Sequence, residues 1–380
     1  MKRTKNYAQI AIPTIAIVLV LFLCNGFKTA SSKYDSTFRS IVGNELTTEN
    51  VGILASIISP KKHIEWSGAS GYADKETKKE LQPNGKFRIA SVTKTYVAAT
   101  ILRLWEDKKL VLDDPITKYI SKAYADTLVK GGYDPNRITI RHLLTHSGGL
   151  SEHTQSPKFE NEFLKTRHVW SREEQVSDLI KYTKPVGLPG EQFGYSDTGY
   201  ILLGDIIESI TKQSMGDAIC EQLHFKQLGI NDTHMEAFDG DFTGARIHQY
   251  HNGFDTYNFH PSMDYYGGGG LLSTTADLSR FFHCLFNHKV FRHKSTLDTM
   301  LTPVKYNTKQ ALDYRMGIWR IEINGMTAYT HSGFWGTQVV YIPEINTALA
   351  ANYSQRWNVK GPAPVIQKLV DAVQAKGVEK

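Results

Sequence analysis

The sequence predicts an α+β fold, in which helices flank one antiparallel sheet built from the N- and C-terminal segments and a mostly helical region is inserted between the halves of that sheet. Strand-like apolar runs occur near both ends of the chain, whereas helical periodicity fills its middle. Hydrophobic residues make up 41% of the 380 residues and charged residues 22%, which is typical of a globular chain. We expect one domain over 34–380, with the sheet region in 34–109 and 304–380 and the helical insertion in 110–303.

The first elements follow from local patterns. A short helix is expected over 34–46. The apolar runs "VGILASII" and "IEWSGASGYAD" flank the turn-like stretch "SPKKH", and this pattern of two strands around a turn predicts a hairpin. In "SVTKTYVAATILRLWEDKKL", Val97, Ile101 and Leu104 have helical spacing. Ser91 stands at the start of this helix, where serine is a favourable N-cap.

Helices then dominate as far as about Pro303, and strands return after it. "GIWRIEI" and "MTAYTH" enclose Asn324-Gly325, which is the strongest short signal for a hairpin. "QVVYIP" and "TALAANY" supply two more strands, and a last helix is expected over 364–375. The helices expected in the middle of the chain are Ile140–His146, Arg172–Tyr182, Asp197–Thr211, Met215–Gln227, Thr274–Asn287 and Ser295–Leu301.

The N-terminus predicts export. Four of the six net positive charges lie in residues 1–30, so the basic balance comes from this leader and does not indicate a nucleic-acid partner. The apolar run Ile10–Cys24 has 15 residues, fewer than the about 20 that span a membrane. Residues 1–33 therefore predict a signal peptide, with an uncleaved membrane anchor or a lipid on Cys24 as alternatives. The expected location is periplasmic, extracellular or on the outer face of the cytoplasmic membrane.

The remaining cysteines, Cys220 and Cys284, lie in helix-like apolar segments and are expected to be free thiols. The chain has no Cys-x-x-Cys spacing, which excludes a zinc ribbon or a redox motif of that type.

The stretch "ASVTKT" places Ser91 and Lys94 three residues apart, on one face of a helix. A serine hydroxyl needs a base to act as a nucleophile. Lysine serves as that base only if its pKa falls well below about 10.4; otherwise it stays charged and stabilises an alkoxide or a phenolate. The simpler interpretation is a helix cap beside a solvated charge.

Two further segments carry candidate residues. Tyr195-Ser196-Asp197 precedes an apolar helix, so Tyr195 and Asp197 are able to point into one cleft; alternatively Ser196 or Asp197 caps the helix and Tyr195 belongs to the core. His331-Ser332-Gly333 ends the second strand of the Asn-Gly hairpin, where Gly333 lets a substrate backbone lie close. Its simpler interpretation is a turn with a surface histidine.

Taken in this order, these segments resemble the serine β-lactamase and penicillin-binding protein family. The likeness is to the branch of class C β-lactamases, D,D-carboxypeptidases, related esterases and D-aminopeptidases, where the second motif is Tyr-x-Asn and the third is Lys-Thr-Gly or His-x-Gly. "RHLLTHSGGL" and "GGGGLLSTTADLSRF" also resemble that branch, and the likeness covers about residues 36–375. It implies a β-lactamase/transpeptidase-like fold.

The resemblance also implies roles. Ser91 would form an acyl-enzyme, while Lys94 and Tyr195 would share the proton transfers. The backbone N–H groups of Ser91 and Phe334 would form the oxyanion hole, where one donor is worth ~3 kcal/mol. The residues that would contact the substrate are Asp197, His331, Ser332, Gly333 and Phe334.

Two residues depart from the family pattern. Asp197 stands in the place of the usual Asn; a carboxylate only accepts hydrogen bonds, so Asp197 is expected to pair with Lys94, hold it cationic and shift the base role to Tyr195. His331 stands in the place of Lys, and its protonation is a hypothesis for binding an anionic substrate between roughly pH 6 and 7.5. The histidine form resembles carboxypeptidases and esterases more than β-lactamases.

Other motifs are given structural interpretations. His142 and His146 have the i, i+4 spacing of zinc ligands but lack the glutamate base, and His248, His251 and His260 are expected to pack among aromatic residues. "GGGG" at 267–270 lacks a following Lys-Ser/Thr, so we expect backbone passing near the active cleft instead of a phosphate loop. No metal and no cofactor is expected.

The sequence thus predicts an exported serine hydrolase that acts on amide or ester bonds, as a D-alanyl-D-alanine carboxypeptidase-like peptidase or a related esterase. The alternatives are a class C-like β-lactamase, a non-catalytic penicillin-binding sensor and, more remotely, a zinc hydrolase. The expected partners are small-molecule or short-peptide substrates such as peptidoglycan stem peptides, no nucleic acid, and a membrane only through the N-terminal segment.

Overall fold

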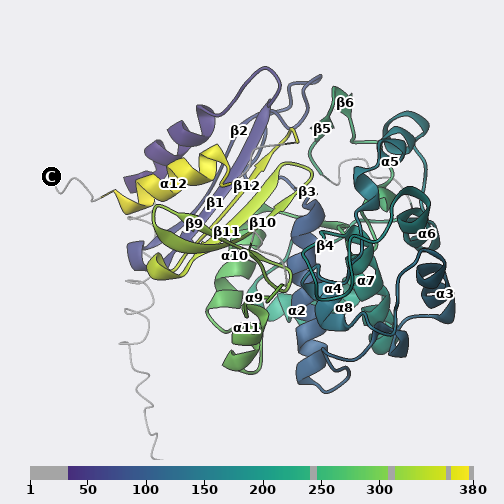
Figure 1. Cartoon of the computed structure of the whole chain (residues 1–380). Helices are drawn as coiled ribbons and strands as arrows, with labels where there is room; N and C mark the ends of the chain where they lie inside the picture. The colour runs from purple at the N-terminus through teal and green to yellow at the C-terminus, as the bar shows by residue number, and fades with distance from the viewer. Residues whose placement is uncertain (1–32, 240–245, 307–312, 357–360, 376–380) are drawn as a thin grey trace, which may run out of the picture.

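Strands from both ends of the chain form one seven-stranded antiparallel sheet, with the order β2-β1-β12-β11-β10-β9-β8 (Figure 1). The computed structural model describes residues 33–239, 246–306, 313–356 and 361–375, so residues 1–32 of the expected leader lie outside the described residues. The strands are β1 (Gly52–Ser59), β2 (Ile64–Gly71), β8 (Asp313–Tyr314), β9 (Trp319–Ile323), β10 (Met326–Gly333), β11 (Thr337–Ile342) and β12 (Thr347–Tyr353).

Helices cover both faces of this sheet, which explains why its central strands are buried on both sides. The helix of residues 33–43 and α12 (Pro364–Gln374) lie on one face (Figure 1). There Phe38 packs against Trp66, with ring centres 5.2 Å apart. On the other face α10 (Thr275–Phe286) packs against β1, and Ser56 donates a hydrogen bond to the Thr275 carbonyl at 2.6 Å. The expected α+β fold with terminal segments pairing in one sheet is confirmed.

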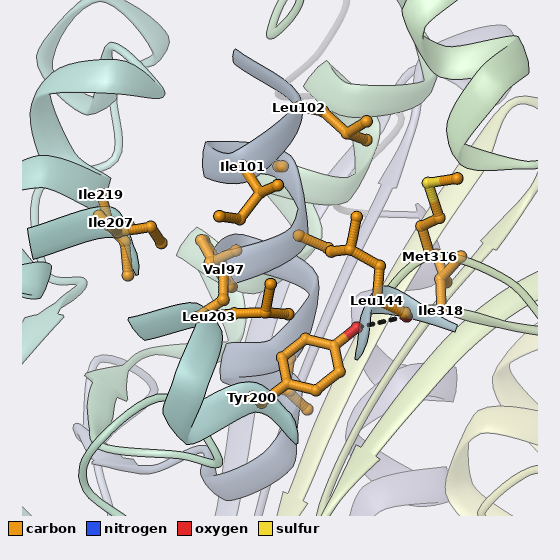
Figure 2. Close-up of a cluster of buried hydrophobic side chains, with 14 of the residues drawn as sticks. Val97, Ile101, Leu102, Leu144, Tyr200, Leu203, Ile207, Ile219, Met316 and Ile318 are labelled. Atoms are coloured by element: carbon orange, nitrogen blue, oxygen red, sulfur yellow. Dashed lines mark hydrogen bonds between the residues drawn. The ribbon is translucent and has the colours of Figure 1, made fainter. Parts of the chain in front are cut away.

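The helical region is built around α2 (Thr93–Glu106), in which every residue from Thr93 to Leu104 is buried. A helix that is buried all round belongs to a core, and Figure 2 shows Val97 and Ile101 of α2 meeting apolar residues of its neighbours. Tyr200 stands in this cluster and donates to the Leu144 carbonyl at 2.8 Å. Any group at the start of α2 is therefore held rigidly.

Three of the remaining helices, α7 (Asp197–Thr211), α8 (Met215–Gln222) and α11 (Lys294–Met300), pack against α2, and the remaining strands form two small sheets. The helices are α3 (Lys122–Lys130), α4 (Ile140–Leu144), α5 (Pro157–Asn161), α6 (Arg172–Tyr182), α7 (Asp197–Thr211), α8 (Met215–Gln222), α9 (Phe225–Leu228) and α11 (Lys294–Met300). The strands are β3 (Phe87–Arg88), β4 (His234–Met235), β5 (Tyr250–His251), β6 (Phe254–Asp255) and β7 (Leu271–Ser273).

Several expectations for individual elements need correction. Ser91 is not an N-cap: it lies in a 3₁₀ turn, Ala90–Val92, and α2 starts at Thr93 without a side-chain cap. The helix expected over Met215–Gln227 is two helices, because His224 adopts a left-handed conformation between α8 and α9. The hairpin around Asn324-Gly325 is confirmed, and both of its turn residues have positive φ.

Two findings bear on compartment and chemistry. Cys220 and Cys284 are free cysteines, as expected. Over the part of the chain that the structure describes, no helix has the length and apolar character that crossing a membrane requires. The domain boundaries stated above remain a prediction.

Candidate active site

Ser91 is one of the residues that line a cavity of about 410 Å³, and it directly follows a strained residue. Ala90 has φ +45°, a conformation that costs a non-glycine residue about 1 kcal/mol or more, and the turn it makes leads into Ser91. The side chain of Ser91 is partly exposed, whereas Ala90 and Val92 on either side are buried. The turn therefore presents one hydroxyl to the cavity at the start of a rigid helix.

Lys94 is fully buried and its ammonium group is surrounded by oxygen atoms. Nζ donates to Ser91 Oγ at 2.9 Å and to the Gly268 carbonyl at 2.6 Å, and it lies 2.6 Å from Asp197 Oδ1. An ammonium has three protons and no lone pair, so Lys94 acts here only as a hydrogen-bond donor. Lys94 in this state cannot accept the proton of Ser91.

The charge of Lys94 is held by Asp197. Burial by itself would lower the pKa of Lys94, but the charges of Asp197 and Tyr195 and their hydrogen bonds outweigh it and raise that pKa above its usual range. Lysine is thus cationic at neutral pH. Of the two roles that the sequence left open for Lys94, the geometry favours the charged one.

Tyr195 is positioned by the start of α7. The hydroxyl of Ser196 accepts a hydrogen bond from the Gly199 N–H, so Ser196 is the N-cap, and the Ser196 N–H donates to His146 Nδ1 at 3.1 Å. The His146 ring packs against the Tyr195 ring, with their centres 4.2 Å apart and their planes tilted by 36°. The cap and this histidine fix the phenol from two sides.

The Tyr195 hydroxyl meets both Ser91 and Lys94. Burial raises the pKa of Tyr195 to about 12, although the nearby Lys94 charge and hydrogen bonds from Ser91 and Lys94 work in the opposite direction. Lys94 Nζ also lies 5.0 Å from the centre of the Tyr195 ring. Since the cationic Lys94 has no lone pair, the Tyr195 oxygen is the hydrogen-bonded neighbour of Ser91 that has the capacity to accept a proton.

The glycine run 267–270 lies against this cluster, as expected. A Cβ at Gly268 would come within 3.2 Å of the Asp197 carboxyl group, and Gly267 has φ +122°. The missing side chains let the Gly268 carbonyl reach Lys94. The run thus supplies a backbone ligand for the buried ammonium.

His331 is buried and neutral, so the proposed charge switch between pH 6 and 7.5 is wrong. Burial, together with the charge of Lys94, lowers the pKa of His331 to about 3. Nδ1 donates to the Ser332 carbonyl at 2.9 Å, and Nε2 accepts from the Tyr314 hydroxyl at 3.2 Å. The histidine braces the end of β10 and carries no charge for a substrate.

We expect an NMR titration to show His331 in the neutral Nδ1–H tautomer from pH 8 down to pH 5. The unfolded chain protonates this histidine near pH 6.5 while the folded protein resists it, so its contribution to the free energy of unfolding is complete above pH 6.5 and is lost as the pH falls toward 3. A chemical-shift transition of His331 centred between pH 6 and 7 would contradict this account.

The end of β10 lies against the Ser91 turn. A Cβ at Gly333 would stand 2.1 Å from the Ile89 carbonyl, so only glycine permits this approach. Phe334 follows it and lines the cavity, whereas Ser332 is exposed and is not among the residues that line it. The structure therefore brings Gly333 and Phe334 to the nucleophile, but not the side chain of Ser332.

The cavity has walls of contrasting character. One wall is apolar. Among the described residues that line the cavity, Arg356 is the one with a permanent positive charge, and its guanidinium lies 4.1 Å from the centre of the Phe334 ring. The residues that line the cavity are Ala90, Ser91, Glu152, Thr154, Gln155, Phe159, Glu160, Phe163, Tyr195, Asp197, His251, Met263, Asp264, Phe334 and Arg356.

Sequence reasoning missed Glu152 and Asp264. Glu152 Oε2 accepts from the Asp197 N–H at 2.9 Å, and Asp264 Oδ2 is buried beside Gly269. Glu152 follows the family-like stretch "RHLLTHSGGL" closely, which was the available signal for it. No spacing or periodicity relates Asp264 to a serine far earlier in the chain.

The histidines have structural partners. His142 Nδ1 accepts the Thr139 N–H in the cap of α4, His248 stacks on Tyr257 at 4.0 Å, and His251 Nε2 lies 3.0 Å from Glu160. Within residues 33–239, 246–306, 313–356 and 361–375, no group of three or more histidine, cysteine or acidic side chains is arranged to hold a metal ion.

Comparisons with known proteins agree with this geometry. The chain matches the family described as "Beta-lactamase" over residues 41–369. It is 28% identical to penicillin-binding protein 4* of Bacillus subtilis over 287 residues, which cover 70% of this chain and 59% of that protein, so it spans less than two thirds of this relative's length.

Two solved structures are similar. One is a D-stereospecific amidohydrolase from a Streptomyces species, with a TM-score of 0.74 and 23% identity over 90% of this chain and 98% of the other. The second is the D-amino acid amidase of Ochrobactrum anthropi SV3, with a TM-score of 0.73 and 21% identity over 90% and 99%. At these identities the likeness shows the fold alone.

Proposed function

Because the chain belongs to the beta-lactamase family of serine hydrolases, we propose that it is an exported hydrolase that cleaves amide or ester bonds through an acyl intermediate on Ser91. The observation that carries this proposal is the contact of Ser91 Oγ with Lys94 Nζ at 2.9 Å beside the Tyr195 hydroxyl, inside a cavity. A hydroxyl with a proton acceptor and a neighbouring cation is the arrangement that nucleophilic catalysis by serine requires.

The proton steps follow from the charges of the cluster. The phenolate form of Tyr195 takes the proton of Ser91 as Oγ bonds to the substrate carbonyl carbon, and Lys94 stabilises the phenolate. The tetrahedral oxyanion lies between the N–H groups of Ser91 and Phe334. Tyr195 then donates the proton to the leaving group as the carbon–heteroatom bond breaks. In the second half of the reaction water attacks the acyl carbon while Tyr195 takes its proton, and Tyr195 returns that proton to Ser91 Oγ as the acid is released.

A D-alanyl-D-alanine-type peptide is the substrate class that we favour. Arg356 offers a cation for a terminal carboxylate, and Phe159 and Phe163 offer an apolar surface for the acyl part. A related esterase is the close alternative. A class C-like β-lactamase fits less well, because Asp197 stands in place of Asn and His331 is engaged with Tyr314.

Labelling and turnover test this proposal together. A fluorophosphonate and a fluorescent penicillin are expected to label the wild type and the exposed-serine control Ser295→Ala, but not Ser91→Ala. The wild type is then expected to turn over a D-alanyl-D-alanine peptide or a small ester faster than nitrocefin. Labelling without turnover would favour the sensor, and labelling of Ser91→Ala would contradict the assignment of the nucleophile.

The variant Gly333→Ala is expected to lower kcat/KM by about 10²-fold and to lower the melting temperature as well, because the added Cβ meets backbone and not a flexible side chain. The added Cβ would collide with the Ile89 carbonyl and displace the Phe334 N–H from the oxyanion hole, where one donor is worth about 10²–10³-fold. Ester hydrolysis and thermal unfolding measure the two effects. Gly43→Ala is the matched control, because Gly43, like Gly333, is not among the glycines with positive φ and its Cβ would meet only Ser70 Oγ, at an ordinary 3.6 Å; equal losses of activity in both variants would contradict the role of Gly333.

A further inference from the structure

Three carboxyl groups gather around the single buried ammonium of the site. Asp197 pairs with Lys94, the Asp197 N–H binds Glu152, and Asp264 lies across the glycine run, where a Cβ at Gly269 would be 2.7 Å from Asp264 Oδ2. All three carboxyl groups line the cavity that contains Ser91. The positive charge of Lys94 offsets only one of them.

Glu152 has no cationic partner. Its oxygens accept from the N–H groups of Asp197 and Thr154 and from the Thr154 hydroxyl. The nearest imidazole, Nδ1 of His153, lies 3.7 Å away, but burial lowers the pKa of His153 to about 4, so it is neutral. The side chain of Glu152 is only 8% exposed, which makes an uncompensated negative charge costly there.

Asp264, like Glu152, has no cationic partner of its own in the part of the chain that the structure describes. Its Oδ2 is buried and has no hydrogen-bond partner among the described residues, and Asp264 is one of the residues that line the cavity. The guanidinium that acts on it from nearby, Arg88, is already engaged by Glu236 at 2.6 Å. Burial raises the pKa of the Asp264 carboxyl to about 7, and burial next to Asp197 raises the pKa of Glu152 above its usual range. A buried acceptor without a donor indicates a group that arrives with the ligand.

We propose that the acidic wall formed by Glu152, Asp197 and Asp264 binds an ammonium group on the acyl part of the substrate. Within the favoured class of D-alanyl-D-alanine-type substrates, the enzyme then prefers those whose acyl residue has a free amine over those whose amine is acylated, as it is in a stem peptide. This inference rests on the proposed acyl transfer to Ser91. The ammonium donates to Asp264 Oδ2 and to Glu152, and its charge replaces the missing counter-ion of the wall. The apolar side of the cavity, with Phe159 and Phe163, receives the remainder of the acyl group.

A matched pair of achiral esters tests the preference. Glycine ethyl ester carries the ammonium, and N-acetylglycine ethyl ester lacks it. We expect kcat/KM of the wild type to favour the free amine by tenfold or more after correction for the hydroxide-catalysed rates, since a charge-assisted contact in a buried site is worth about that factor. We expect Glu152→Gln to reduce the ratio at least tenfold, mainly through KM, and the ratio within each variant cancels any change in the general reactivity of Ser91.

Glu160→Gln is the control within the same cavity. Glu160 already binds His251 and Asn252 at 3.0 Å each, so we expect its ratio to stay within about twofold of the wild type. Inhibition of the wild type by benzylamine and benzyl alcohol tests the same contact without a variant, and we expect the amine to bind at least tenfold more tightly.

The outcomes separate the two proposals. Equal use of both esters together with equal inhibition by amine and alcohol would overturn the ammonium site, while an acyl adduct on Ser91 in the same samples would leave the hydrolase assignment intact. Absence of an adduct from both esters and from 4-nitrophenyl acetate would overturn both. A ratio that falls equally in Glu152→Gln and Glu160→Gln would assign the effect to general charge and overturn the specific contact.

Discussion

Replacing Lys94 with methionine is expected to lower kcat/KM by about 10³-fold or more. The loss removes the cation that stabilises the Tyr195 phenolate and the hydrogen bond to Ser91 Oγ, and a positioned proton-transfer system is worth about 10²–10⁴-fold. It also leaves the Asp197 carboxylate, 12% exposed, without its partner. Breaking a buried ion pair costs about 3–5 kcal/mol, so the free energy of unfolding is expected to fall as well.

The double variant Lys94→Met with Asp197→Asn separates these two effects. Removing both charges relieves the unpaired carboxylate, so stability is expected to recover toward the wild type while activity stays low. Denaturant unfolding and ester hydrolysis are the two measurements. Activity that returned together with stability would contradict a chemical role for Lys94.

Replacing Tyr195 with phenylalanine is expected to lower kcat/KM by about 10³-fold with a smaller effect on stability, because the ring still packs against His146 and only the hydroxyl is lost. The wild type is expected to show a pH dependence that the variant lacks. With the pKa of Tyr195 at about 12, the phenolate fraction is ~10⁻⁵ at pH 7 and grows tenfold per pH unit. Log kcat/KM should therefore rise with a slope near one between pH 6 and 9.

A neutral substrate such as 4-nitrophenyl acetate keeps this profile independent of substrate charge, and the uncatalysed rate is subtracted at each pH. In Tyr195→Phe the slope is expected to vanish. A plateau of the wild-type profile above pH 7 would show that a group of near-neutral pKa, such as an uncharged Lys94, accepts the proton, and would contradict the assignment to Tyr195.

The sequence was sufficient for the elements with strong local signals. The Asn324-Gly325 turn and the bounds Asp197–Thr211 and Arg172–Tyr182 are set by turn chemistry and helical periodicity, and the structure agrees with them. The expected pairing of Asp197 with Lys94 is likewise present in the structure, since a carboxylate beside a buried ammonium has a strong electrostatic reason to pair with it.

The errors came from tertiary contacts that no local pattern carries. Ser91 has the right residue type and position for an N-cap, but its hydroxyl is taken by Lys94 in a turn that Ala90 forms at positive φ. His331 was interpreted as a titrating group. Its burial and its hydrogen bond with Tyr314 depend on packing from distant segments, which no local sequence pattern shows. Glu152 and Asp264 reach the cavity from separate loops. They matter because neither has a cationic partner among the described residues, and a local sequence pattern does not show which partners a side chain has in the fold.

Acid-quenched reaction of the wild type with 4-nitrophenyl acetate, followed by tryptic digestion and fragment mass analysis, tests the chemistry of this site most directly. The peptide of residues 89–94 is expected to carry one acetyl group on the side chain of Ser91, at up to one per molecule during the first turnover, and to lose it at the steady-state rate. Hydrolysis that proceeds while this peptide stays unmodified, or with the acetyl group on another residue, would contradict acyl transfer to Ser91.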